Sequence, residues 1–199
     1  MRTSYITLGI IRENKININK SVFITEGLEV HNHQQAINFI AKIKAKFPDA
    51  THHCWAYIIG DNIMNDDDGE PGGTAGLPIL NVIKRNNLNN IIVVVIRYFG
   101  GKKLGVKGLI DAYRLSAEKL IGKSIKVKRN IGVVYKICCD YNYANKIATS
   151  NDKRIKVLNQ EFSDTVVMII FVEIKAVKEY DYIFKNSNIQ LISKIESIN

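Results

Sequence analysis

The 199-residue chain is predicted to be an α+β protein of two domains, and three observations support this. Residues 1–123 combine short runs of β-branched and aromatic residues with three segments of helical periodicity. Residues 131–199 show the patterns of a strand, a helix, two strands, a helix and a strand, in that order. A basic, polar stretch between them, 124–131, interrupts both patterns and is the expected boundary. The apolar fraction of 46% is sufficient for a core in each domain.

The N-terminal domain begins with a strand-rich region. Residues 5–11 and 21–30 are separated by turn-forming residues, which predicts two or three antiparallel strands. A helix follows, because Asn32 precedes Gln35 by three positions, as in a capping box. Pro48 ends this helix. Its expected buried stripe is Ala36, Ile37, Ile40, Ile43 and Phe47.

The remainder of this domain alternates strands and helices. A strand is expected at 53–59, and a second helix is expected to be capped by Thr74 or Gly76. The continuous apolar run 91–97 predicts a strand covered on both faces. A third helix begins near Gly105, with an inner face formed by Val106, Leu109, Ile110, Tyr113, Ala117, Leu120 and Ile121.

The C-terminal domain has the βαββαβ order of a ferredoxin-like fold. A turn at 162–164 supports the hairpin between its two central strands. The expected strands are 133–139, 155–161, 165–174 and 190–195, and the expected helices are 142–150 and 178–186.

Composition restricts the location and class of the protein. The longest apolar run, 91–96, is too short to span a bilayer, so no membrane partner is expected. The N-terminus has no hydrophobic segment of signal-peptide length. The three cysteines are odd in number and two are adjacent, which disfavours a disulfide framework and favours the reducing cytoplasm.

The net charge of +9 is concentrated in one part of the chain. Residues 83–136 hold 13 Lys and Arg against 2 Asp and Glu, a net charge of +11. Such a concentration favours an anionic partner, such as RNA or the ribosome. The alternative is that these lysines only solvate helix faces.

Two glycine-rich loops are the main candidate sites. The basic loop, residues 100–108, lies between a strand and a helical pattern, and helix-start amides together with lysines can hold an anion. It matches neither a Walker A loop nor a dinucleotide fingerprint, so nucleotide hydrolysis has no motif support. The alternative role of its glycines is tight turning and close packing. The predicted anion-binding residues are Arg97, Gly100, Gly101, Lys102, Lys103, Gly105, Lys107 and Gly108.

The acidic loop, residues 66–70, allows a hard-metal interpretation, but it does not match an EF-hand. Carboxylates before a helix start also favour the positive end of the helix dipole, so neither a metal nor a cofactor is predicted. Cys54 beside His52 is interpreted as a packed cysteine rather than a nucleophile, and no catalytic residue is assigned. The pocket candidates are His52, Asp67, Asp68, Glu70 and Thr74.

The two loops resemble the signature of the YigZ/IMPACT family. The matching residues are Asp67-Asp68-Gly69-Glu70-Pro71, Gly73-Thr74-Ala75-Gly76, Arg97-Tyr98-Phe99-Gly100-Gly101, Leu104-Gly105 and Gly108-Leu109. The resemblance implies an N-terminal two-layer α/β domain similar to the second domain of a small-subunit ribosomal protein, followed by a ferredoxin-like domain. It also implies regulation of translation, through RNA, the ribosome or a translation-regulatory protein. This chain departs from the family at Leu77, where a basic residue is usual, and at Lys107, which replaces a frequent glycine.

Three functional hypotheses follow. The first is a non-enzymatic, translation-associated regulator that binds its partner through the basic loop. The second is a hydrolase-like enzyme with a pocket between the two loops, in which Asp67, Glu70 and His52 supply acid–base groups. It requires both loops to emerge at the same edge of the sheet. The third is a protein-interaction module that uses the ferredoxin-like sheet.

Overall fold

The computed structural model describes residues 2–185 and 190–198, which belong to two compact units. The N-terminal unit is Ile6–Lys128, and the C-terminal unit is Arg129–Asn199 together with Met1–Tyr5. The division therefore falls within strand β1 (Ser4–Ile10) and strand β7 (Ile125–Cys139). Each unit has hydrophobic core clusters of its own. Autonomous folding of residues 1–123 stays a prediction.

The N-terminal unit is built on a five-stranded sheet whose neighbouring strands all run antiparallel. Its order is β2 (Asn14–Ile18), β3 (Ser21–Glu29), β6 (Ile91–Tyr98), β4 (His52–Ile59) and β5 (Asn62–Asp66). The apolar residues of β6 alternate between the core clusters on the two faces. The prediction of a strand covered on both faces is therefore confirmed.

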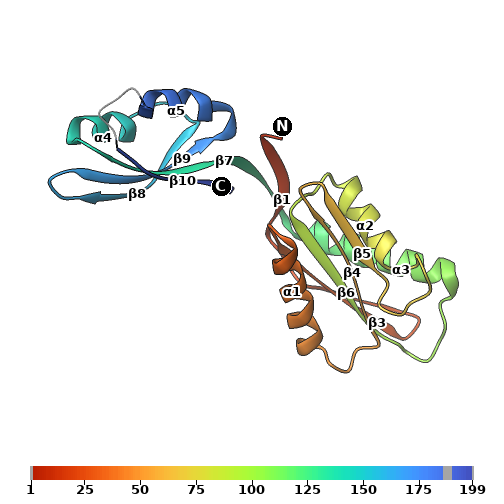
Figure 1. Ribbon diagram of the computed structural model, residues 1–199. Coiled ribbons are helices and arrows are strands. Elements are labelled where there is room, and N and C mark those ends of the chain that lie inside the picture. Colours follow the sequence, from red (N-terminus) through yellow and green to blue (C-terminus); the bar gives the residue numbers. More distant parts are fainter. Residues whose placement is uncertain (1, 186–189, 199) are drawn as a thin grey trace. The chain divides into compact units, whose positions relative to one another are not determined.

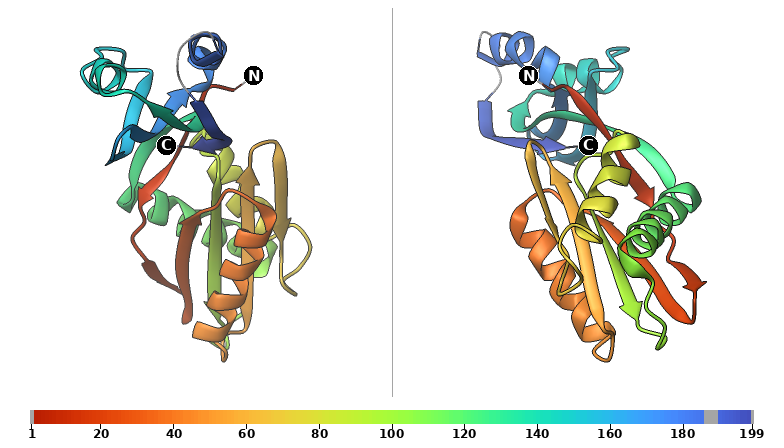
Figure 2. Two further views of the ribbon diagram at one scale, coloured as in Figure 1. Left: turned by 60° about the vertical axis from the view of Figure 1, so that its left-hand side comes forward. Right: turned by 90° about the vertical axis from the view of Figure 1, so that its right-hand side faces the viewer.

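Helices cover both faces of this sheet. Helix α1 (His33–Lys46) packs on one face, whereas α2 (Gly76–Arg85) and α3 (Gly105–Lys123) pack on the other (Figures 1 and 2). The family resemblance implied a domain of two layers. The structure has three: α1, the sheet, and the pair of helices α2 and α3. The mixed α+β class is confirmed.

Helix α1 begins as its sequence predicts. The Asn32 side chain accepts a hydrogen bond from the Gln35 amide at 2.9 Å, and the Gln35 side chain accepts one from the His31 amide at 2.8 Å. The predicted buried stripe is wrong at Ile37, which is 38% exposed. Phe39, which is 8% exposed, faces the sheet instead.

The inner face of α3 also differs from the expected stripe. Val106 is 61% exposed and Ile110 is 36% exposed, so neither belongs to the core. Ala112 and Ser116 are buried in their place. These small side chains let the helix lie close to its neighbours, and the apolar periodicity alone did not reveal the shift.

The C-terminal unit has the predicted ferredoxin-like topology. Strands β10 (Gln190–Ile198), β7, β9 (Val166–Glu173) and β8 (Ile155–Phe162) pair antiparallel in that order, and β1 also pairs with β7. Its helical elements are α4 (Tyr141–Ala148), the turn η1 (Ile174–Ala176) and α5 (Val177–Lys185). Helices α4 and α5 lie on the same face of the sheet (Figure 1). The expected end of the last helix at 186 lies outside the described residues.

None of the helices in the described part of the chain has the length and hydropathy of a membrane-spanning segment.

Candidate functional site

The two signature loops lie at the same end of the N-terminal sheet. Strand β4 pairs antiparallel with both β5 and β6, so those two strands run in the same direction. Asp66 at the end of β5 pairs with Trp55, and Arg97 near the end of β6 pairs with His52. The chain therefore enters the acidic loop and the basic loop beside the start of β4.

The short strand β5 that causes this arrangement was not predicted from the sequence. A two-residue turn, Gly60-Asp61, joins it to β4, because Ile59 pairs directly with Asn62. Gly60 has a φ of 60°, a left-handed conformation that glycine adopts readily. A Gly-Asp pair between two strand-like runs is a recognised hairpin signal, and it could have revealed β5.

Asp67 holds the acidic loop in place. Its Oδ1 accepts hydrogen bonds from the amides of Ala75 at 2.9 Å and Gly76 at 2.8 Å, and its Oδ2 accepts one from Gly73 at 2.7 Å. Ala75 is the N-cap residue of α2 and has no side-chain capping bond of its own. Asp67 thus satisfies amides at the helix start from eight residues upstream.

The prediction that Thr74 or Gly76 caps α2 is wrong. The Thr74 hydroxyl donates to the Pro71 carbonyl at 2.7 Å and so closes the turn before the helix. Gly76 has a different role, because a Cβ at this position would lie 2.8 Å from the backbone of Asp66. Glycine is therefore required for the close approach of two backbone segments.

Asp68 connects the acidic loop to β4 and α1. Its side chain accepts hydrogen bonds from Lys44 Nζ at 2.8 Å and from the His53 amide at 2.7 Å. Burial raises the pKa of this carboxyl, but these two hydrogen bonds outweigh burial and the pKa lies below its usual range. His52 Nδ1 lies 2.8 Å from the Asp68 carbonyl oxygen.

Glu70 is the centre of a buried polar group that we name the Glu70 cluster. The cluster consists of Glu70, Arg97, Tyr113, His52 and Cys54. Glu70 Oε1 accepts hydrogen bonds from Arg97 Nη1 at 2.5 Å and from the Tyr113 hydroxyl at 2.7 Å. His52 Nε2 lies 3.9 Å from the same oxygen. The side chains of Glu70 and Arg97 are 3% and 5% exposed, so their opposite charges are buried together.

Arg97 therefore belongs to the interior and not to the exposed basic surface for which it was a candidate. Its guanidinium lies 5.5 Å from the ring centroids of both Phe23 and Phe99. Its Nη2 lies 3.4 Å from the Ser21 hydroxyl oxygen. This surrounding fixes the guanidinium against Glu70.

Cys54 is a packed thiol. Its Sγ lies 3.0 Å from the Asp67 carbonyl oxygen and 3.3 Å from the Tyr113 hydroxyl. Burial raises the pKa of the Cys54 thiol well above its usual value, so it is not activated as a nucleophile. Burial also raises the pKa of Tyr113, which stays a neutral donor to Glu70.

Tyr113 is the member of the cluster that was predicted only as a core residue of α3. Its ring is fully buried and packs edge-on against Phe23 at 5.4 Å. A buried tyrosine hydroxyl needs a hydrogen-bond partner. The tyrosine on the predicted inner face of this helix was therefore the one sequence signal of a polar contact in the core. The partner, Glu70, lies 43 residues away in the chain.

The basic loop has a different character. Lys102, Lys103 and Lys107 are exposed and make no ion pair with any other described residue. Helix α3 begins at Gly105 after an N-cap, Leu104, that makes no side-chain capping bond. The first amides of this helix therefore lie beside three lysines.

The glycines of the basic loop serve two purposes. Gly101 and Gly105 have φ values of 80° and 72°, which allow the loop to turn. Gly100 makes a close contact instead, because a Cβ there would lie 2.0 Å from the Lys20 carbonyl oxygen. Gly108 lies within α3, where a Cβ would meet Leu104 at 3.1 Å. Packing and loop shape thus account for these four positions.

Arg114 lies on α3 about two turns beyond the basic loop. Its guanidinium pairs with Asp111 at 3.2 Å and with Glu118 at 3.0 Å on the same helix. The positive charge around the start of α3 is therefore carried mainly by the three loop lysines. Among the described residues, no group of three or more His, Cys, Asp or Glu is placed to hold a metal ion.

Comparison with known proteins gives a consistent result. Residues 19–121 match the Impact N-terminal domain. The chain is 38% identical to the IMPACT family member YvyE of Bacillus subtilis over 179 residues, which cover 88% of this chain and 82% of that protein. It is 30% identical to the IMPACT family member YigZ of Escherichia coli over 169 residues, covering 82% of this chain and 83% of that protein. A solved structure described as a hypothetical protein aligns at a TM-score of 0.70 with 27% identity, over 97% of this chain and 98% of its own.

Proposed function

This chain belongs to the IMPACT family, and we propose that it is a non-enzymatic regulator of translation that binds RNA, the ribosome or a ribosome-associated protein. The contact surface in this proposal is the basic loop at the start of α3. The observation that carries it is the exposure of Lys102, Lys103 and Lys107 without ion-pair partners among the described residues. We place the protein in the cytoplasm as part of the same proposal, because all three cysteines are free thiols.

Charge distribution supports an anionic partner. Residues 83–136 carry a net charge of +11, and the loop lies within this segment. Lysines beside the uncapped start of a helix combine a positive charge with backbone donors. Phosphate groups of RNA provide the matching acceptors, and recognition of this kind depends strongly on salt.

The test is cosedimentation with ribosomes and binding to single-stranded RNA across a salt series. Replacing Lys102, Lys103 and Lys107 together with Gln should weaken binding and reduce the salt slope by up to about three units, roughly one for each lost phosphate contact. The matched control replaces Lys15, Lys42 and Lys119, which are exposed residues of the same unit outside the loop, and should retain most of the affinity.

Two results would reject this proposal. Equal losses in the loop variant and in the control would mean that net charge alone causes the binding. Failure of the parent protein to bind RNA and ribosomes at low salt would remove the anionic partner altogether.

A hydrolase-like function is the competing hypothesis, and one observation favours it. The acidic and basic loops emerge at the same end of the sheet, and His52 Nε2 lies 3.9 Å from Glu70 Oε1. Against it, Arg97 neutralises the buried Glu70 carboxylate, and the Cys54 thiol is not activated. A hydrolytic turnover that Glu70→Gln abolishes without loss of stability would favour the enzyme over the binding protein.

A further inference from the structure

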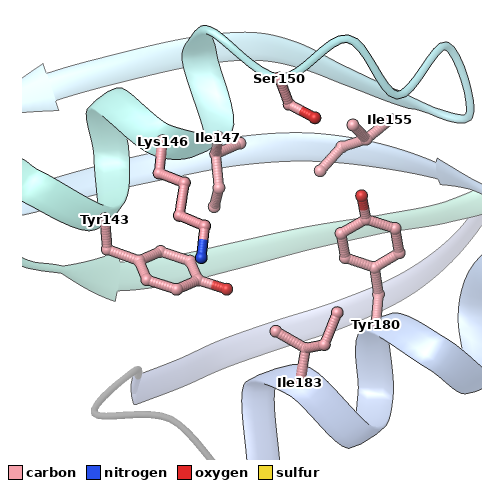
Figure 3. A pocket seen from close by; sticks show the side chains of 7 residues that line it. All are labelled: Tyr143, Lys146, Ile147, Ser150, Ile155, Tyr180 and Ile183. Carbon is pink, nitrogen blue, oxygen red and sulfur yellow. The ribbon is translucent and has the colours of Figure 1, made fainter.

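The C-terminal unit contains a pocket of about 260 Å³ between helices α4 and α5. Figure 3 shows side chains from the two helices facing one another across it. The lining residues are Tyr143, Lys146 and Ile147 of α4, Ser150, Ile155 of β8, and Tyr180 and Ile183 of α5. All of them belong to the C-terminal unit.

Three isoleucines form the apolar part of the pocket wall. Ile147, Ile155 and Ile183 pack at the core cluster of this unit, yet Ile155 and Ile183 are only partly buried. Helix α4 ends at Ala148, and the chain then reaches β8 at Ile155 through a loop that carries Ser150. The short helix and this loop leave the isoleucines in contact with the open volume. An apolar surface of this kind gains free energy when a ligand covers it.

Among the described residues that line the pocket, Lys146 carries the one charged side chain. It makes no ion pair with any residue in the described ranges 2–185 and 190–198. In Figure 3 its amino group lies at the open space between the two helices, near the Tyr143 ring. Lys146 also lies in the last turn of α4, where a cation favours the helix dipole, so a purely structural role is the alternative.

The nearby carboxylates are engaged by other groups. Asp152 is held by Arg154 at 2.6 Å and by the Tyr180 hydroxyl at 3.1 Å, and the Arg154 hydrogen bonds lower the pKa of this carboxyl strongly. Glu179 pairs with Arg154 at 2.9 Å. Asp140 caps α4 through the Tyr143 amide at 2.7 Å. Lys146 is exposed, and none of these described carboxylates pairs with it, so its ammonium group is available to a ligand at the pocket.

Hydroxyl groups complete the polar part of the site. Ser150 Oγ accepts a hydrogen bond from the Asp152 amide at 3.1 Å, which leaves its own O–H available to donate. Burial and the hydrogen bond to Asp152 raise the pKa of Tyr180 to about 12, so this hydroxyl stays neutral. The pocket therefore offers one ammonium group, a hydroxyl donor and an apolar wall.

We propose that this pocket binds a small monocarboxylate with an apolar body, whose carboxylate pairs with Lys146 and whose body packs on the isoleucines. A single ammonium group suits a single negative charge, whereas a dianionic phosphate requires more donors than the lining residues supply. The volume lies below the roughly 300–1,000 Å³ typical of drug-sized ligands, so the ligand is a small one.

The experiment uses the ¹⁵N-labelled full-length protein and two probes of nearly equal shape, phenylacetate and its neutral amide, phenylacetamide. Titration with phenylacetate should shift amide signals of α4, α5 and the start of β8, and the shifts should saturate. Phenylacetamide should bind about two- to fivefold more weakly, because it lacks the charge that Lys146 recognises.

Lys146→Gln should weaken phenylacetate binding by about two- to fivefold, the range of an ion pair at an exposed lysine, with little change for phenylacetamide. Lys178→Gln is the control, because Lys178 is an exposed residue of α5 that does not line the pocket. Equal binding of the two probes, shifts that do not saturate, or an unchanged affinity in Lys146→Gln would each overturn the proposal. Because Lys146 is exposed, the variant should keep a dispersed spectrum.

Discussion

The acidic loop and the basic loop lie at the same end of one sheet, yet their charges are used in opposite ways. Asp67 caps a helix, Asp68 binds Lys44 and the His53 amide, and Glu70 is buried against Arg97. The lysines of the basic loop are exposed and make no ion pair with the rest of the described chain. One loop therefore contributes to the stability of the fold, whereas the charges of the other are exposed and make no ion pair within the described residues, as the proposed function requires. Changes in stability should follow the acidic loop, and changes in binding should follow the basic loop.

The largest effect on stability is expected from breaking the buried ion pair between Glu70 and Arg97. Arg97→Met leaves the Glu70 carboxylate buried without its cation, which should lower the free energy of unfolding of the N-terminal unit by about 3–5 kcal/mol. Urea denaturation followed by the fluorescence of Trp55, the single tryptophan and a residue of β4, reports on this unit.

Arg114→Met provides the matched control for this substitution. Arg114 makes two ion pairs on the surface of α3, where solvent weakens them, so losing them should change the stability much less than Arg97→Met does. If both variants lose the same stability, the Glu70 cluster does not hold the unit together. The double variant Glu70→Leu with Arg97→Met should recover part of the loss, because no unpaired charge is then buried.

A smaller effect is expected from the helix cap. Asp67→Asn keeps one carbonyl acceptor for the start of α2 but loses the charge and the acceptor that serve Gly73. We expect a loss of about 1–2 kcal/mol, in the range of other capping residues. Asp49→Asn, at an exposed position after α1, is the control and should be nearly neutral. A neutral result for Asp67→Asn would mean that the backbone alone shapes the loop.

Most elements of the fold could be predicted from the sequence, but the contacts of the Glu70 cluster could not. Local signals predicted the Asn32 cap, the buried strand β6 and the βαββαβ order, because each depends on periodicity or on residues a few positions apart. The Glu70 cluster could not be predicted in this way. Glu70 meets Arg97 only through the pairing of β4 with both β5 and β6, and β5 was not recognised. The sequence indicated the two loops as a candidate site but could not show which of their charges would be buried.

The pH dependence of stability offers a finer test of the acidic loop. The pKa of Asp68 in the folded protein lies below its ordinary value of 3.8, so the folded state binds this proton less tightly than the unfolded state. Its stabilising contribution is complete above that ordinary value and is lost as the pH falls through the lower folded pKa. The difference in stability between the parent and Asp68→Asn should therefore shrink as the pH falls below about 4. A difference that stays constant down to this pH would mean that Lys44 and the His53 amide do not favour the ionised form.

The smallest effect on stability is expected where the largest effect on binding is proposed. Lys102, Lys103 and Lys107 are exposed, and no described residue forms an ion pair with them, so replacing each with Gln removes no contact that stabilises the folded state. Each change should alter the free energy of unfolding by no more than about 0.5 kcal/mol. Removing positive charge near the start of α3 even relieves an unfavourable interaction with its helix dipole, so a slight gain is the expected sign. Thermal denaturation of the triple variant measures this directly. A loss of several kcal/mol would show that the basic loop also supports the fold, and any loss of RNA affinity in that variant would then reflect damage to the loop rather than missing charge.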